Sequence, residues 1–134
     1  MRRSKRGERS VEPGEVEAVD RGRCCGVGAR GIAAGLPVDA HSLIALSAPR
    51  PLFIGSGLPE QGDAWVDPKG MFMAAAAADL VWELLGADGL PTDEMPAPGD
   101  GLADGALAWC QHLGGHANEP KWEAFLDFAA RYFE

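Results

Sequence analysis

Hydrophobic and polar residues change their spacing at several points along the chain, and two of its segments predict strands. Leu52, Phe53 and Ile54 form a short run that ends at Gly55. This is the pattern of a parallel strand that is covered on both faces. Residues 106–113 form a second run, which is apolar from Ala106 to Cys110 before Gln111 and His112. We expect these two runs to be strands of one sheet.

The spacing near the two ends of this region predicts helices. A short helix is expected over residues 40–46, because Asp39 can cap it and Pro49 stops it. Another helix is expected over residues 119–133, where apolar side chains repeat at helical spacing. That repeat predicts packing through a single apolar stripe of Trp122, Phe125, Leu126, Ala129, Tyr132 and Phe133.

The middle of the chain predicts its longest helix, over residues 68–85. Pro68 is favoured at the first position of a helix, Asp67 can cap it, and Gly86 can end it. We expect a break midway, near Ala78. Because helices alternate with strands, the element order predicts an α/β fold, with a parallel sheet and helices on its faces.

Residues 1–35 differ from the rest of the chain. They are rich in Arg, Gly and Glu, and their apolar residues follow neither a strand nor a helix period. We therefore expect a disordered or non-native N-terminal segment. Order should begin near Leu36, so that residues 36–134 form one partial domain.

Composition and charge narrow the classes of partner. The net charge is −8, and the acidic excess lies after residue 30. An acidic body repels nucleic acid, so DNA and RNA are not expected partners. The sequence has no stretch of about 18 apolar residues, so no membrane span is predicted. The basic start lacks the apolar segment of a secretory signal, and no compartment is predicted.

The cysteines and histidines favour no metal site. The three cysteines are Cys24, Cys25 and Cys110, and none forms a CxxC pair. His112 and His116 have the spacing of metal ligands on a helix, with Cys110 nearby. However, two glycines between them argue against a helix there, and no fourth ligand is evident. No metal and no organic cofactor are expected.

Two loops carry the candidate chemistry, because each follows a predicted strand. In open parallel sheets, sites form beyond the carboxyl ends of the strands. The first loop offers Glu60, Asp63 and Asp67, and the second offers His116 behind a flexible glycine pair. An acid followed by a histidine about 50 residues later is the order of the serine-hydrolase triad Ser…Asp/Glu…His.

These loops also carry a family resemblance, which covers residues 36–134. Four runs together resemble the C-terminal part of bacterial glucuronoyl esterases of carbohydrate esterase family 15. The runs are LPVDAHSLIALSAPRPLFIGSG, DAWVDPKGMFMAAAAADLVWELLG, EMPAP and QHLGGHANEPKWEAFLDFAARYF. The resemblance implies an α/β-hydrolase fold with a Ser-His-acid triad. It also implies hydrolysis of the ester between 4-O-methyl-glucuronic acid of xylan and a lignin alcohol. This activity needs no cofactor.

The resemblance assigns roles to three residues. His116 would be the triad histidine, Asp63 the triad acid, and Trp65 a tryptophan that lines the glucuronate pocket. Asp67 stays an alternative acid, but it has a structural role as a helix cap, whereas Asp63 has none. Alternatively, Trp65 only covers the loop against the core.

The chain departs from the family pattern in one respect that bears on activity. None of its five serines, Ser4, Ser10, Ser42, Ser47 and Ser56, lies in a G-x-S-x-G elbow. Ser56 directly follows a predicted strand, but no helix follows it at once. With 134 residues the chain is also too short for a complete α/β-hydrolase, whose crossover units need roughly 30 residues each.

The function predicted from sequence is therefore the C-terminal portion of a glucuronoyl-esterase-like serine hydrolase, inactive alone. Two alternatives stay open: a non-catalytic carbohydrate-binding or interaction module, and a gene-fragment or frame-shift product. With upstream strands missing, an exposed strand edge is expected to favour self-association.

Overall fold

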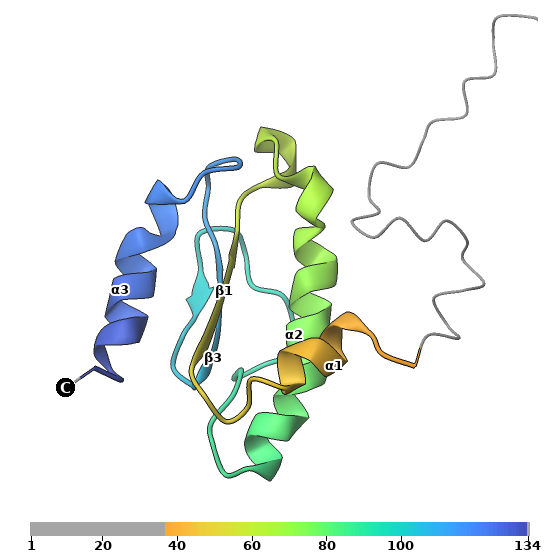
Figure 1. Ribbon diagram of the computed structural model, residues 1–134. Helices are drawn as coiled ribbons and strands as arrows, with labels where there is room; N and C mark the ends of the chain where they lie inside the picture. The colour runs from red at the N-terminus through yellow and green to blue at the C-terminus, as the bar shows by residue number, and fades with distance from the viewer. Residues whose placement is uncertain (1–36, 134) are drawn as a thin grey trace, which may run out of the picture.

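The computed structural model describes residues 37–133, in which a small sheet lies between helices (Figure 1). Helices α1 (Ala40–Ala45) and α2 (Pro68–Leu84) lie on one side of the sheet, and α3 (Trp122–Ala130) lies on the other. The expected disorder of residues 1–35 lies outside the described residues. The predicted α/β class, with helices on both faces of a sheet that contains parallel strands, is confirmed.

The sheet has three strands in the order β1-β3-β2. Strands β1 (Leu52–Ser56) and β3 (Leu107–Gln111) are parallel, and both match predicted strands. β1 runs two residues past the predicted end at Ile54. The two-residue strand β2 (Gly101–Leu102) pairs antiparallel with β3 and lies in a stretch predicted to be loop.

Helix α2 begins where the sequence indicated and runs without interruption for 17 residues. Asp67 has left-handed backbone geometry (φ 50°), and its carboxylate accepts the Gly70 N–H at 3.1 Å. The expected midway break near Ala78 is wrong. The Asp79 carboxylate accepts the Leu90 N–H at 2.7 Å, so this side chain fixes the following loop and does not compete for the helix backbone.

The core forms where α2 packs on β3. Phe72, Ala75, Ala78 and Trp82 recur at helical spacing and are all buried. The two alanines let the helix approach the sheet closely, and the Phe72 ring meets the Trp109 ring edge-on, with centroids 5.4 Å apart. This packing fixes the strand from whose end the second candidate loop emerges.

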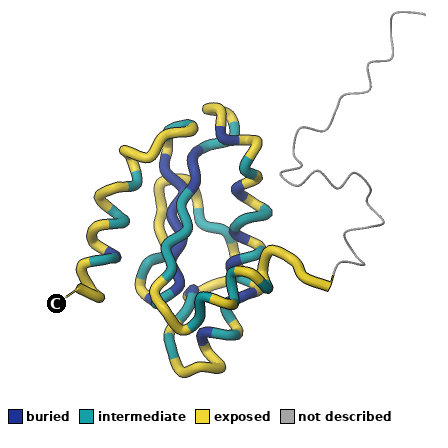
Figure 2. The backbone as a smooth tube through the Cα atoms, in the orientation of Figure 1, coloured by how far each residue is buried: buried dark blue, intermediate teal, exposed yellow. Residues whose placement is uncertain are grey.

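Helix α3 is shorter than predicted and packs through a different residue. It follows a short 3-10 helix, Glu119–Lys121, and the predicted apolar stripe is largely exposed (Figure 2). Phe128, which the stripe omitted, is 5% exposed, while Leu126 is 59% exposed. The reason is that α3 meets the sheet mainly at Phe53, whose ring lies 5.6 Å from both Phe125 and Phe128.

Among the described helices, none has both the length and the apolar character needed to cross a bilayer.

Candidate active site

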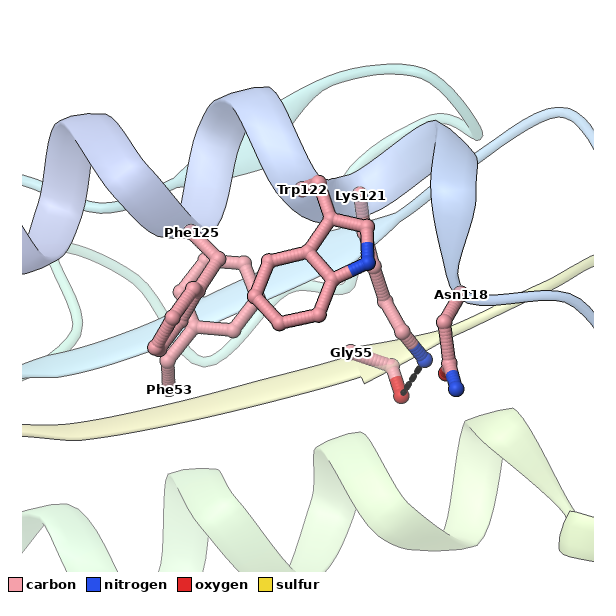
Figure 3. A pocket seen from close by; sticks show the side chains of 6 residues that line it. All are labelled: Phe53, Gly55, Asn118, Lys121, Trp122 and Phe125. Carbon is pink, nitrogen blue, oxygen red and sulfur yellow. Dashed lines mark hydrogen bonds between the residues drawn. The ribbon is translucent and has the colours of Figure 1, made fainter.

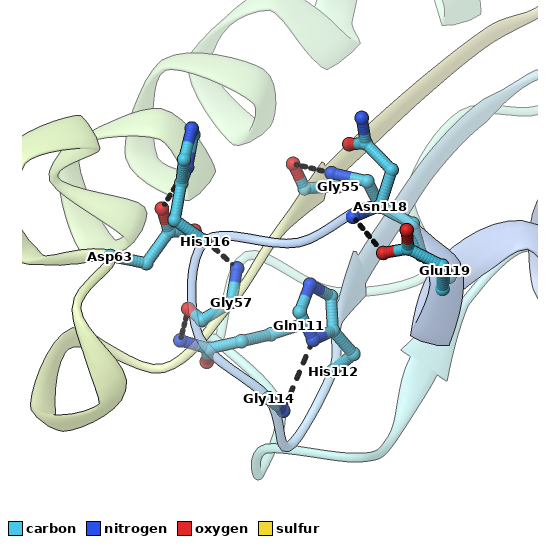
Figure 4. Close-up of polar contacts among 10 residues, drawn as sticks. Gly55, Gly57, Asp63, Gln111, His112, Gly114, His116, Asn118 and Glu119 are labelled. Atoms are coloured by element: carbon cyan, nitrogen blue, oxygen red, sulfur yellow. Dashed lines mark hydrogen bonds and ion pairs between the residues drawn. The ribbon is translucent and has the colours of Figure 1, made fainter.

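The two candidate loops meet at the carboxyl-terminal ends of β1 and β3 (Figure 4). The first loop follows β1 and contains two short 3-10 helices, Pro59–Gln61 and Ala64–Val66, with Asp63 between them. The second follows β3 and carries His116. The parallel register of the two strands brings these segments together at one end of the sheet, as the sequence predicted.

Asp63 and His116 form a hydrogen-bonded pair. The His116 Nδ1 atom lies 2.8 Å from Asp63 Oδ1, and the Gly57 N–H donates to Asp63 Oδ2 at 2.5 Å. The Asp63 residue is 4% exposed, whereas the His116 side chain is 64% exposed. A fixed, buried carboxylate therefore orients an imidazole that faces solvent.

The surroundings of Asp63 favour its charged form. Burial raises the pKa of the carboxyl, but three groups together outweigh burial and lower it below the usual value. They are the Gly57 N–H bond, the bond and charge of His116, and the charge of Lys121. Asp63 is thus ionised at neutral pH, as an acceptor that orients a histidine must be.

Asp67 has a different role. Its carboxylate caps α2 through the Gly70 N–H, and its side chain is not the partner of His116. The sequence argument that separated Asp63 from Asp67 by the capping role of Asp67 agrees with this geometry.

Two glycines allow the loops to touch. A Cβ at Gly57 would lie 2.2 Å from the Gly115 carbonyl oxygen, and a Cβ at Gly115 would lie 1.9 Å from the Gln61 carbonyl oxygen. The Leu58 N–H also donates to the Gly114 carbonyl at 2.7 Å. The glycine pair before His116, expected to be flexible, is instead closely packed. This packing fixes the position of His116 relative to Asp63.

Trp65 borders the exposed side of the pair. Its ring meets the His116 ring in a T-shaped arrangement, with centroids 4.9 Å apart and an interplanar angle of 66°. Trp65 is 51% exposed. It therefore presents an aromatic surface beside the imidazole, where a sugar ring could stack.

Two further side chains weighed from the sequence, those of Ser56 and His112, are buried away from solvent, whereas Glu60 is exposed. Ser56 is 2% exposed, so its hydroxyl is not accessible to a substrate. His112 is also buried, and its Nδ1 atom accepts the Gly114 N–H at 3.1 Å, which holds the second loop. Within residues 37–133, no three His, Cys, Asp or Glu side chains are grouped so as to hold a metal ion.

Lys121 was missed by the sequence argument. It lines a pocket of about 120 Å³ with Asp63, His116 and Asn118, and its Nζ atom lies 3.5 Å from the Gly55 carbonyl oxygen. A Cβ at Gly55 would lie 2.8 Å from Lys121 Cδ, so the glycine leaves the room that the lysine stem occupies. The sequence feature that could have indicated Lys121 is Gly55, the glycine that ends the first apolar run.

Comparisons with known proteins connect this chain to one family. The family model "Glucuronyl esterase, fungi" matches residues 29–86. Carbohydrate esterase MZ0003, from an unknown prokaryotic organism, is 39% identical over 95 residues, which are 70% of this chain and 21% of that protein. A CE15 glucuronoyl esterase from Teredinibacter turnerae is 52% identical with a TM-score of 0.66, over 71% of this chain and 22% of that one.

A glucuronoyl esterase from Solibacter usitatus is 39% identical with a TM-score of 0.65, over 73% of this chain and 24% of that one. The chain thus spans 21% to 24% of the length of these relatives.

Proposed function

Because the chain is a relative of the CE15 glucuronoyl esterases, we propose that it carries the acid–base part of a serine ester hydrolase active site. His116 is the general base and acid, Asp63 is the acid that orients it, and the substrate is a glucuronate ester of plant cell walls. The nucleophile is none of the five serines of this sequence.

The observation that carries this proposal is the bond between buried Asp63 and exposed His116. An ionised carboxylate can only accept a hydrogen bond, so His116 Nδ1 carries the hydrogen. In a neutral imidazole the other nitrogen, Nε2, is then the acceptor. That nitrogen can take the proton of a serine hydroxyl during attack on the ester carbonyl and return it to the leaving alcohol.

Asp63 supports this proton transfer in two ways. Its bond fixes the ring tautomer, and its negative charge stabilises the imidazolium that forms while His116 holds the proton. The second carboxylate oxygen is occupied by the Gly57 N–H, which prevents the acid from turning away. Trp65 is proposed to contact the sugar, because its half-exposed ring lies against His116.

A chimera tests the proposal. Residues 37–134 would replace the matched segment of the Teredinibacter turnerae enzyme, to which they are similar at 52% identity. We expect the chimera to hydrolyse a methyl ester of glucuronate. The isolated 134-residue chain should show no turnover, since Ser56, the last residue of β1, is buried and none of the serines lies in a G-x-S-x-G elbow. A folded chimera without activity would contradict the proposal, as would turnover by the isolated chain.

The exposure of Trp65 also favours a second candidate, a carbohydrate-binding module without catalysis. In that case the isolated chain should bind glucuronoxylan oligosaccharides, and this binding should quench the tryptophan fluorescence of the chain. Trp65→Ala should abolish the binding, while Trp122→Ala, which removes a ring of similar exposure on α3, should leave it intact. Equal loss in both variants would exclude a site at Trp65.

A further inference from the structure

Lys121 lies next to the Asp63–His116 pair and has no part in the proton transfer described above. Its side chain lines the pocket of about 120 Å³ that Asp63 and His116 also line. The residue is half-buried, and its stem occupies the space left by Gly55, so that Nζ lies 3.5 Å from the Gly55 carbonyl oxygen (Figure 3). A cation is therefore held beside the pair.

The charge of Lys121 is not neutralised by an acidic side chain within residues 37–133. The ion pairs in this part of the chain do not include the lysine. The Gly55 carbonyl, at the limit of hydrogen-bond distance, is an uncharged acceptor. Cys110, which the charge of Lys121 also reaches, is no counterion, because burial raises the pKa of its thiol and keeps it neutral. Lys121 therefore acts on the pair with its full charge.

The elements around the pair carry other titratable side chains, but none of these lines the pocket. Those of the two loops, of β3 and of the 3-10 helix that holds Lys121 are Glu60, Asp67, Cys110, His112 and Glu119. Asp67 caps α2, and the Glu119 carboxylate accepts the Asn118 N–H at 3.1 Å. Helix α2 faces the pocket with the uncharged Met71, and no residue of α3 lines it. Among the described residues, Lys121 is thus the permanent cation of this pocket.

A positive charge at this place favours one protonation state of the pair. Burial alone would raise the pKa of the Asp63 carboxyl, and the Gly57 N–H, His116 and Lys121 together lower it. The same cation disfavours a second positive charge on the imidazole, since like charges repel. Both effects keep protons off the pair. They leave a carboxylate and a neutral ring whose Nε2 atom can accept a proton.

We propose that Lys121 is a positioning residue that holds the Asp63–His116 pair as carboxylate and neutral imidazole at mildly acidic pH, where the pair alone would take up a proton. This inference rests on the proposed function and adds a residue that acts through the pair without touching the substrate. The same charge disfavours the imidazolium that forms during proton transfer. Lys121 should therefore help activity in acid and give no advantage at alkaline pH.

The stem of Lys121 also packs at Gly55, so the variants must separate the charge from the packing. Lys121→Met keeps a stem of similar length and removes the charge, and Lys121→Gln is a second neutral variant. Lys121→Arg keeps the charge. Lys69→Met is the matched control, because it changes the net charge by the same amount at an exposed residue of α2 that does not line the pocket.

Two measurements test the inference. The first is an NMR titration of the Asp63 carboxyl carbon in the full 134-residue chain. The pKa of Asp63 should be higher in both neutral Lys121 variants than in wild type, Lys121→Arg or Lys69→Met. The second is the pH profile of the chimera. Lys121→Met should lower kcat/KM about 3-fold or more at pH 5, and leave it unchanged or higher at pH 8, while Lys121→Arg keeps the wild-type profile.

The outcomes separate this inference from the proposed function. A raised pKa of Asp63 in both neutral variants, with a folded chimera that does not hydrolyse a glucuronate methyl ester, supports the action of Lys121 on the pair and contradicts the function. An active chimera whose pH profile survives Lys121→Met overturns the inference and leaves the function standing. An equal rise of the Asp63 pKa in Lys69→Met, or equal loss of kcat/KM at pH 5 and pH 8, would also overturn it, because net charge or packing would then explain the effect.

Discussion

Asp63 and His116 lie 53 residues apart in the sequence and yet share a 2.8 Å hydrogen bond between Oδ1 and Nδ1. The parallel pairing of β1 with β3 brings the two loops to one end of the sheet, and Gly57 and Gly115 let them touch. The bond therefore depends on the register of the strands and on two residues that lack side chains.

The lowered pKa of Asp63 predicts a stability that falls in acid. A carboxyl whose pKa is lower in the folded state contributes stability above its unfolded pKa, about 3.9, and this is lost as pH falls through the folded pKa. Urea unfolding between pH 7 and pH 2.5 should show the loss in the wild-type chain. Asp63→Asn should lack this part of the pH dependence, and equal slopes in both proteins would contradict it.

The contact between the loops predicts a cost for any side chain at position 57. Gly57→Ala places a Cβ against the Gly115 carbonyl, and we expect it to lower the free energy of unfolding by about 1–3 kcal/mol. Gly101→Ala is the matched control, because its Cβ would meet only the Trp109 carbonyl at an ordinary 3.6 Å. Denaturant melts compare the two, and a larger loss at position 101 would count against the packed-loop account.

Sequence reasoning located the pair from the family resemblance, and local signals supported it. Pro68 directly after Asp67 marks a helix start, which gave Asp67 a capping role and left Asp63 for His116. Each loop also follows an apolar run whose length and flanking residues indicate a strand. The helix start and the strand ends are set by neighbours in the chain, so they can be found without knowledge of the fold, whereas the roles of Asp63 and His116 came from the resemblance.

The parts that sequence reasoning missed depend on distant contacts. The stripe on α3 omitted Phe128 because periodicity gives the apolar side of a helix but not which residue meets Phe53. Strand β2 has two residues, too few to show a period. Lys121 reaches the site only because Gly55, 66 residues earlier, leaves room for its stem.

The corrected packing of α3 makes its own prediction. Phe128→Ala should lower the free energy of unfolding by about 3–5 kcal/mol, because it empties a buried aromatic site. Leu126→Ala, two positions earlier and exposed, should change it by less than about 0.5 kcal/mol. Thermal or denaturant unfolding measures both free energies. Comparable losses in the two variants would indicate that α3 packs through the stripe expected from the sequence.

The kcat/KM of the chimera on a methyl ester of glucuronate, with His116→Ala compared to His41→Ala, tests the central claim most directly. His116 pairs with Asp63, whereas His41 is an exposed residue of α1. We predict that His116→Ala lowers kcat/KM by about 1000-fold or more, as loss of a triad histidine does, and that His41→Ala leaves it unchanged. An active chimera whose kcat/KM survives His116→Ala would contradict the proposal that this histidine is the general base.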